Sequence, residues 1–208
     1  MEFKKIQLNG FKSFSEKTTF LIEEGLTGIV GPNGCGKSNI VESLRWCMGE
    51  TSAKSMRGSG MEDVIFSGTS NKPSKNIAEV IINISNPEKS GSFQFKEFEE
   101  IEIRRKIERE KGSRFFVNEK EVRAKDAQMF FADLSTGAHS PSIISQGRIG
   151  SLVTAKPQDR RAILEEAAGI SGLHARRHEA ELRLNAAENN LKRADELRRQ
   201  LEKQLINL

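Results

Sequence analysis

Residues 31–38 read Gly-Pro-Asn-Gly-Cys-Gly-Lys-Ser and have the spacing G-x-x-x-x-G-K-[ST]. Glycines in such a loop let backbone N–H groups surround phosphate oxygens, and the free amides of a following helix direct positive charge at the same anion. Lys37 would then reach the β and γ phosphates of a nucleotide, and the Ser38 hydroxyl would hold Mg²⁺. The spacing therefore predicts a site for ATP and Mg²⁺, and the alternative is a glycine-rich turn that matches by chance.

The neighbouring elements are the ones that this motif requires. The apolar run Leu26–Val30 leads into the loop and predicts a strand, and apolar residues spaced for one helix face follow over Ser38–Met48. Gly49 can end that helix. We expect cofactor contacts from the loop and the start of the helix, namely Pro32, Asn33, Gly34, Cys35, Gly36, Lys37, Ser38 and Asn39.

A second half of the catalytic site is missing from the sequence. A complete ATPase of this kind needs an apolar strand that ends in Asp, to hold Mg²⁺ and position water. Phe130–Asp133 is the nearest candidate, but it has no second carboxylate and is typical of a helix end. Asn71–Ser74 lacks the Asp of a guanine-reading Asn-Lys-x-Asp, which disfavours a GTPase.

The first 154 residues predict an α/β fold. Apolar runs separated by turn residues predict strands, and a further helix is expected from Pro157 to about Gly169. Besides Leu26–Val30, the expected strands are Phe3–Leu8, Thr18–Ile22, Ala78–Ile84, Ile101–Ile107, Arg114–Val117 and Ser142–Ser145.

The last third has a different composition. Leu173–Leu208 contains no Gly, Pro or aromatic residue and is rich in strong helix formers. Its apolar residues recur at alternating steps of three and four, which indicates a coiled-coil seam: Leu184, Ala187, Leu191, Ala194, Leu201, Leu205 and Leu208. A helix of this length would reach about 54 Å, so we expect it to project outward as an arm. The alternative is an amphipathic helix folded back on the core, and the absence of a stop signal suggests a truncated helix.

The composition further limits the class of protein to which the chain can belong. The chain has 208 residues, 36% hydrophobic and 30% charged, with a net charge of +4 and two cysteines. This excludes a disordered or disulfide-rich secreted protein, and no apolar stretch predicts a membrane span. We therefore expect a cytoplasmic protein in which Cys35 and Cys47 are reduced thiols, the latter in the core.

Basic residues are concentrated between Arg104 and Lys125. This segment contains nine basic residues and only four Glu, and we expect it to form a hairpin that turns at 118–120. Such a surface would contact DNA phosphates without reading sequence. The alternative is a solvated strand face of mixed charge. The candidate DNA contacts are Arg104, Arg105, Lys106, Arg114, Lys120 and Arg123.

Taken together, these segments resemble the N-terminal head segment of SMC (structural maintenance of chromosomes) proteins of the bacterial condensin type. The resemblance covers nearly the whole chain, and its motifs are jointly specific. They are Gly10–Phe14, Gly31–Ile40, Arg57–Asp63 with Ile65-Phe66, Ile143–Gly147, Arg160-Arg161 and Glu165–Ile170.

The resemblance implies an ABC-type P-loop half head with a mixed sheet, followed by a projecting coiled-coil helix. Residues 1–155 would form the N-terminal lobe, 156–172 a helical transition and 173–208 the start of an antiparallel arm. The signature motif, the acidic strand and the catalytic Glu would lie in the C-terminal half of the same chain.

The resemblance also assigns site residues. Gln146 would sense the γ-phosphate through Mg²⁺, Arg57 would act in DNA-stimulated hydrolysis, and Lys12 and Ser13 would lie close to the nucleotide. The catalytic candidates are thus Lys37, Gln146 and Arg57, with Ser38 and Gln146 at the metal. The alternatives are that Gln146 is an ordinary strand-end residue, that Arg57 is a solvated loop charge, and that Lys12 and Ser13 belong to a plain turn.

The expected function is ATP-dependent head engagement that drives DNA binding, chromosome condensation and segregation. The partners would be double-stranded DNA, the C-terminal half of the chain, a second head in a homodimer and a kleisin-type subunit, in a nucleoid-associated location without membrane. Alternatives are a coiled-coil ABC-type DNA repair ATPase, a stand-alone P-loop kinase or transferase, and a non-catalytic scaffold.

Overall fold

The structure is a computed structural model of the chain. It describes residues 2–87, 98–134, 140, 142–144, 148–168 and 170–206.

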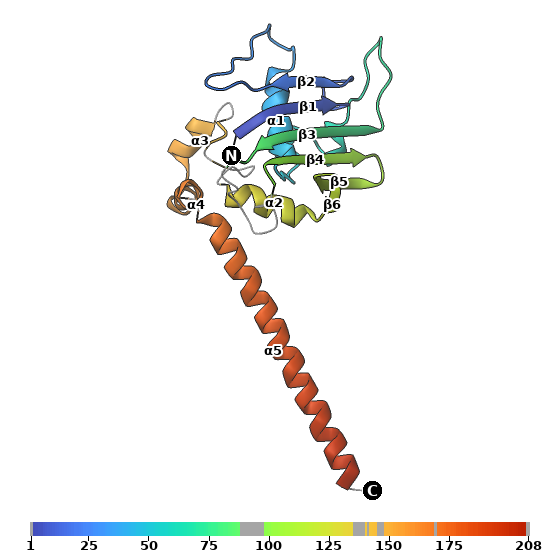
Figure 1. Cartoon of the computed structure of the whole chain (residues 1–208), viewed down its shortest axis with the longest axis vertical. Coiled ribbons are helices and arrows are strands. Elements are labelled where there is room, and N and C mark those ends of the chain that lie inside the picture. Colours follow the sequence, from blue (N-terminus) through green and yellow to red (C-terminus); the bar gives the residue numbers. More distant parts are fainter. Residues whose placement is uncertain are drawn as a thin grey trace.

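A six-stranded sheet forms the body of the molecule (Figure 1). Its strands lie in the order β2-β1-β3-β4-β5-β6, and every neighbouring pair is antiparallel. Their bounds are β1 Glu2–Asn9, β2 Thr18–Leu21, β3 Ile77–Ser85, β4 Glu100–Glu108, β5 Gly112–Val117 and β6 Lys120–Val122.

Helices pack on one face of this sheet and extend beyond it. Helix α1 crosses behind the sheet, and α5 runs away from the body (Figure 1). The helices are α1 Lys37–Cys47, α2 Ala124–Asp133, α3 Arg148–Thr154, α4 Pro157–Ala167 and α5 Ser171–Ile206, with short 3₁₀ turns at Lys54–Met56 and Met61–Val64. Among the described residues, none of the helices combines the length and the apolar character that a membrane span requires.

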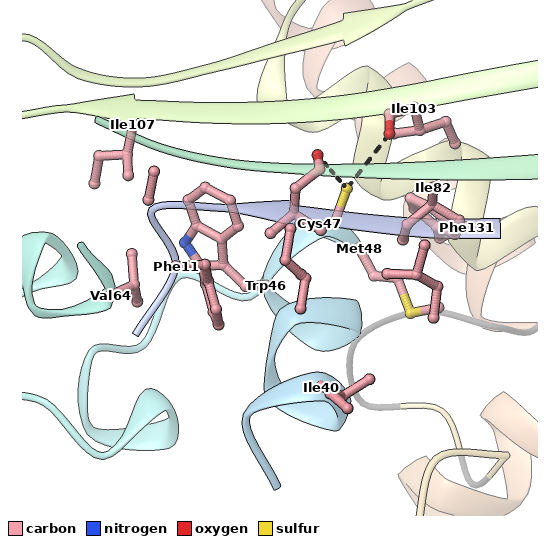
Figure 2. Packing of buried hydrophobic residues seen from close by; sticks show 14 of the residues in the cluster. Phe11, Ile40, Trp46, Cys47, Met48, Val64, Ile82, Ile103, Ile107 and Phe131 are labelled. Carbon is pink, nitrogen blue, oxygen red and sulfur yellow. Dashed lines mark hydrogen bonds between the residues drawn. The ribbon is translucent and has the colours of Figure 1, made fainter. Parts of the chain in front are cut away.

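The core lies between the sheet and α1. In β3 and β4 every second residue is buried, as expected for a sheet with one covered face, and these residues meet Ile40, Trp46 and Cys47 of α1 (Figure 2). The Trp46 ring packs against Phe11, with ring centroids 5.4 Å apart. The Cys47 thiol faces the carbonyl oxygens of Val80 and Ile103, and burial raises its pKa to about 12. The expected core position of this cysteine is confirmed.

Most of the expected elements are present, but two segments differ. Leu26–Val30 is not a strand: Leu26 is fully exposed and Val30 is 95% exposed. In Ser142–Ser145, the described residues 142–144 are not in a strand either. The α/β class is confirmed, whereas the described sheet is antiparallel throughout and not mixed, because the segment that enters the phosphate loop does not join it.

Helix α5 is one continuous element of 36 residues that projects outward, which rules out the folded-back alternative (Figure 1). The seam leucines of the arm are exposed, with Leu184 at 61%, Leu191 at 66% and Leu205 at 76%. A heptad seam exposed in this way is typical of a helix that pairs with a second helix.

Candidate nucleotide-binding site

The phosphate loop leads directly into α1, which begins at Lys37. The turn depends on glycine: Gly34 has φ 84° and Gly36 has φ 96°, a region that other residues rarely adopt. Within the described chain, no side chain caps the start of α1, so no side chain competes with an anion for its first amides. The predicted loop–helix geometry is therefore present, although the strand before it is not.

The turn after β1 packs against this loop. A Cβ on Gly36 would lie 2.5 Å from the Ser13 hydroxyl oxygen, so only glycine allows the two segments to approach. The Ser13 hydroxyl also accepts a hydrogen bond from Asn39 Nδ2 at 2.9 Å. The structure thus brings Ser13, Gly36 and Asn39 together, as the sequence-based assignment of all three to one site requires.

The Lys37 side chain folds back over the loop. Its ammonium donates to the carbonyl oxygens of Gly31 and Pro32, the latter at 2.6 Å, and lies 3.9 Å from Cys35 Sγ. Cys35 itself is exposed and free. The charge of Lys37 is therefore held at the mouth of the loop, where it would meet a phosphate.

The residues present fit a nucleotide phosphate with Mg²⁺. Gly34 and Gly36 allow the left-handed backbone of the loop, Lys37 provides a cation, and Ser38 provides a hydroxyl in the first turn of α1. Within the described residues, no three His, Cys, Asp or Glu side chains form a metal-binding group. Asp133 ends α2, as expected for a helix end, and does not follow a strand.

One carboxylate, that of Glu42, contacts both Lys12 and Arg57. Glu42 was not among the site residues predicted from the sequence. Glu42 of α1 is only 8% exposed; its Oε2 accepts from Lys12 Nζ and its Oε1 pairs with Arg57 Nη2. Lys12 Nζ also donates to the Met56 carbonyl oxygen at 2.6 Å. The spacing in the sequence could have indicated it: Glu42 lies four positions after Ser38, which places the two side chains on the same face of the helix.

A cavity of about 300 Å³ opens beside this carboxylate. Ser38, Glu42 and Arg57 line it together with Val41, Arg45, Ser55 and Ile144. Arg57, which the sequence places about 20 residues from the loop, therefore shares a cavity with the predicted Mg²⁺ ligand.

The segment that carries Arg57 is anchored by a buried glutamate. Glu50 is 2% exposed, and its carboxylate accepts from Ser52 N at 2.9 Å, Ser55 Oγ at 2.8 Å and Arg45 Nη2 at 3.0 Å. A buried carboxylate satisfied in this way fixes the backbone around it. Arg57 follows with φ 55°.

Asp63 holds the other side of the same segment. Its Oδ2 accepts from Ser59 N at 2.6 Å, Ser59 Oγ at 2.9 Å and Gly60 N at 2.9 Å. These hydrogen bonds, led by the Gly60 amide, lower the pKa of Asp63 below its ordinary 3.8.

The described residues do not include Ser145, Gln146 and Gly147, so the assignment of Gln146 stays a prediction.

The basic residues between β4 and α2 do not form one surface. Arg104 and Lys106 lie on the uncovered face of β4, where Lys106 is opposite the exposed Arg114 and Arg104 is opposite Phe116. Arg104 stacks over the Phe116 ring at 4.6 Å and lies 3.8 Å from Glu79, so its surroundings match the mixed-charge alternative. The remaining candidates, Lys120 and Arg123, lie at β6 and at the start of α2.

Arg105 is a correction to the expected DNA contacts. It is 3% exposed on the covered face of β4, and its guanidinium lies between the rings of Trp46 and Phe115, at 4.4 and 4.6 Å. Burial lowers the pKa of Arg105 to about 10, which leaves it charged at neutral pH. Arg105 is part of the core and cannot reach DNA in this fold.

Comparison with known proteins agrees with this architecture. Residues 2–208 match the family model described as RecF/RecN/SMC N terminal domain. The chain is 54% identical over 208 residues to the Chromosome partition protein Smc of Rhodopseudomonas palustris, covering all of this chain and 18% of that protein. The chain thus spans less than a fifth of the length of this relative.

Solved SMC heads have the same fold. The Smc head domain with an extended coiled coil from Pyrococcus furiosus, bound to the C-terminal domain of ScpA, is 31% identical with a TM-score of 0.74, over 94% of this chain and 48% of that one. An SMC ATPase studied for ATP-driven dimerization and DNA-stimulated activation is 30% identical with a TM-score of 0.71, over 80% of this chain and 99% of that one. The family match, the fold and the phosphate loop together show that this chain belongs to the RecF/RecN/SMC N-terminal domain family, as the N-terminal part of an SMC-type head.

Proposed function

We propose that the chain forms the ATP-binding half of an SMC head, in which nucleotide binding drives head engagement on DNA. The observation that carries this proposal is the glycine cradle at the start of α1, with Lys37 and Ser38 beside it. The identity to chromosome partition proteins over the whole chain favours chromosome condensation and segregation as the process. No observation on the described residues favours the repair-type alternative.

In this proposal the chain's own groups bind and orient the phosphates. The α1 amides and the Lys37 ammonium would neutralise phosphate charge, and Ser38 and Gln146 are the residues that would hold Mg²⁺. The metal would supply electrostatic stabilisation of charge on the phosphate oxygens. Arg57 would add a further cation from across the cavity.

The catalytic carboxylates are expected from the C-terminal half of the same protein. The exposed apolar residues Leu26 and Val30, just before the phosphate loop, support this, because exposed apolar residues beside a site mark a surface that a partner covers. The exposed seam of α5 supports pairing with a returning helix in the same way. A second head, a kleisin-type subunit and double-stranded DNA complete the proposed assembly; the similar Pyrococcus furiosus head is bound to ScpA.

Titration of the chain with ATP and Mg²⁺, followed by amide NMR shifts of residues 31–39, tests the proposal. We expect saturable shifts that Lys37→Ala abolishes, because the Lys37 ammonium is held over the loop by the carbonyl oxygens of Gly31 and Pro32 and would neutralise phosphate charge there. Turnover by the chain alone should be negligible. Equal binding by Lys37→Ala would contradict the assigned site, and turnover by the chain that Lys37→Ala abolishes would contradict the half-site interpretation.

A further inference from the structure

Glu42 is a charged side chain buried beside the phosphate loop. It lies one helical turn after Ser38, so the two side chains occupy the same face of α1 and line the same cavity. A carboxylate is rarely buried unless cations or hydrogen-bond donors compensate it. Here Lys12 and Arg57 do so, one on each oxygen.

The two cations come from segments that are distant in sequence. Lys12 follows β1, with its amide bonded to the Val64 carbonyl oxygen at 2.7 Å, and Arg57 follows the 3₁₀ turn Lys54–Met56. Both have left-handed backbones, at φ 48° and 55°, which fixes where their side chains begin. Glu42 therefore joins three segments at one point.

The contact with Glu42 does not occupy all the hydrogen-bond donors of Arg57. The pair with Glu42 uses Nη2 of Arg57, and a guanidinium has five N–H donors in a rigid fork, so other donors can face the cavity shared with Ser38. The Arg57 side chain is 60% exposed, whereas that of Glu42 is 11% exposed. The buried carboxylate is thus the rigid member of the pair, and it limits the directions that the exposed guanidinium can take.

We propose that Glu42 is a positioning residue of the nucleotide site: Lys12 holds its carboxylate, and the carboxylate keeps Arg57 in place so that the remaining donors of Arg57 face a phosphate bound near Ser38. This rests on the proposed function in that the phosphate is that of ATP. Glu42 is not a metal ligand in this arrangement, because each of its oxygens already meets a cation.

A double-mutant cycle tests the role. Glu42→Gln keeps the shape and removes the charge, so Arg57 samples more conformations, and ATP affinity should fall about two- to fivefold, as expected for a partly exposed ion pair. In the Arg57→Ala background, Glu42→Gln can no longer act through Arg57, so ATP affinity should fall by less than it does in the unchanged background. Glu42→Asp, which retains the charge, should restore part of the affinity.

Titration with ATP and Mg²⁺ by NMR gives these affinities, and thermal unfolding of each variant is the matched control. Equal losses in both backgrounds would indicate a merely structural carboxylate and overturn the proposal. Tighter ATP binding by Glu42→Gln would also overturn it, because the charge would then act by repulsion alone.

A second measurement needs no nucleotide. The ¹⁵N relaxation of the Arg57 Nε–Hε group should report greater motion in Glu42→Gln than in the unchanged chain. Unchanged relaxation would overturn the proposal even if affinities differ. Failure of Lys37→Ala to weaken ATP binding, in contrast, would count against the proposed function and leave this result on Arg57 standing.

Discussion

The guanidinium of Arg105 donates to the Trp46 carbonyl oxygen at 2.5 Å and thereby joins β4 to the last turn of α1. The same Nη1 donates to Glu50 O at 2.7 Å, and Nε donates to Ser113 Oγ at 2.8 Å. The last carbonyls of a helix lack partners within it, and a cation is favourable at this negative end. Arg105 therefore fixes the far end of the helix whose first residue is Lys37.

Replacing Arg105 should destabilise the fold. Arg105→Ala leaves the buried carbonyls of Trp46 and Glu50 without this donor, and we expect a loss of about 3 kcal/mol in the free energy of unfolding. Urea unfolding measures it. Lys106→Ala, the next residue on the uncovered face, is the matched control and should cost less than about 0.5 kcal/mol. Equal costs would contradict the core role of Arg105.

Alanine at Gly36 should disturb both the loop and the turn against it. The backbone there is left-handed, which costs about 1–2 kcal/mol with a side chain, and the new Cβ would lie 2.5 Å from Ser13 Oγ. We expect weaker ATP binding and a lower Tm. Gly34→Ala, where a Cβ meets no atom within 4 Å, carries only the backbone cost. Ser13→Gly should partly rescue Gly36→Ala; absence of rescue would contradict the steric explanation.

Asp63 should make stability depend on acid pH. Its pKa is lowered in the folded chain, so its contribution is complete above the ordinary 3.8 and is lost as pH falls through the folded-state value. Asp63→Asn should therefore lower Tm at pH 7, and the difference from the unchanged chain should shrink below about pH 4. Thermal unfolding across this range checks the sign. A difference that grows toward acid pH would contradict the assignment.

The exposed basic residues should determine how DNA binding depends on salt. Replacing Arg114, Lys120 and Arg123 by Gln should flatten the slope of log K against log salt by about 0.9 for each DNA phosphate that these residues neutralise. Fluorescence anisotropy with a DNA duplex at several salt concentrations measures the slope. The control replaces three exposed basic residues of α5, Lys192, Arg193 and Arg199. An equal effect of the two triple variants would remove Arg114, Lys120 and Arg123 from the candidate DNA contacts.

The segment before the phosphate loop should matter for assembly and not for the fold of this chain. Leu26→Ser and Val30→Ser change side chains of residues that are 100% and 95% exposed, so we expect changes in unfolding free energy within about 0.5 kcal/mol. Both should weaken co-purification with the C-terminal half of the protein. A large loss of stability would show that the segment already packs in the isolated chain.

The sequence by itself determined the local elements and the identity of the loop. Alternation in β3 and β4, helix periodicity after Lys37 and glycines at Gly34 and Gly36 each act over a few residues, so one chain segment contains the whole signal. The same holds for α5, whose seam is visible without any partner. Leu26–Val30, which was predicted to be a strand and is not one, shows the limit of prediction from local sequence. An apolar run forms a strand only where a neighbouring strand is available to pair with it.

Tertiary structure alone decided which charged side chains lie on the surface and which are buried in the core. Arg104 and Arg105 are adjacent and chemically identical, but the pleat places Arg104 on the uncovered face of the sheet and buries Arg105 against Trp46. Likewise, nothing local marks Glu42 as the meeting point of Lys12 and Arg57, 30 and 15 residues away. Long-range packing creates these contacts, and a charged side chain has its partner only when the folded chain brings the two together.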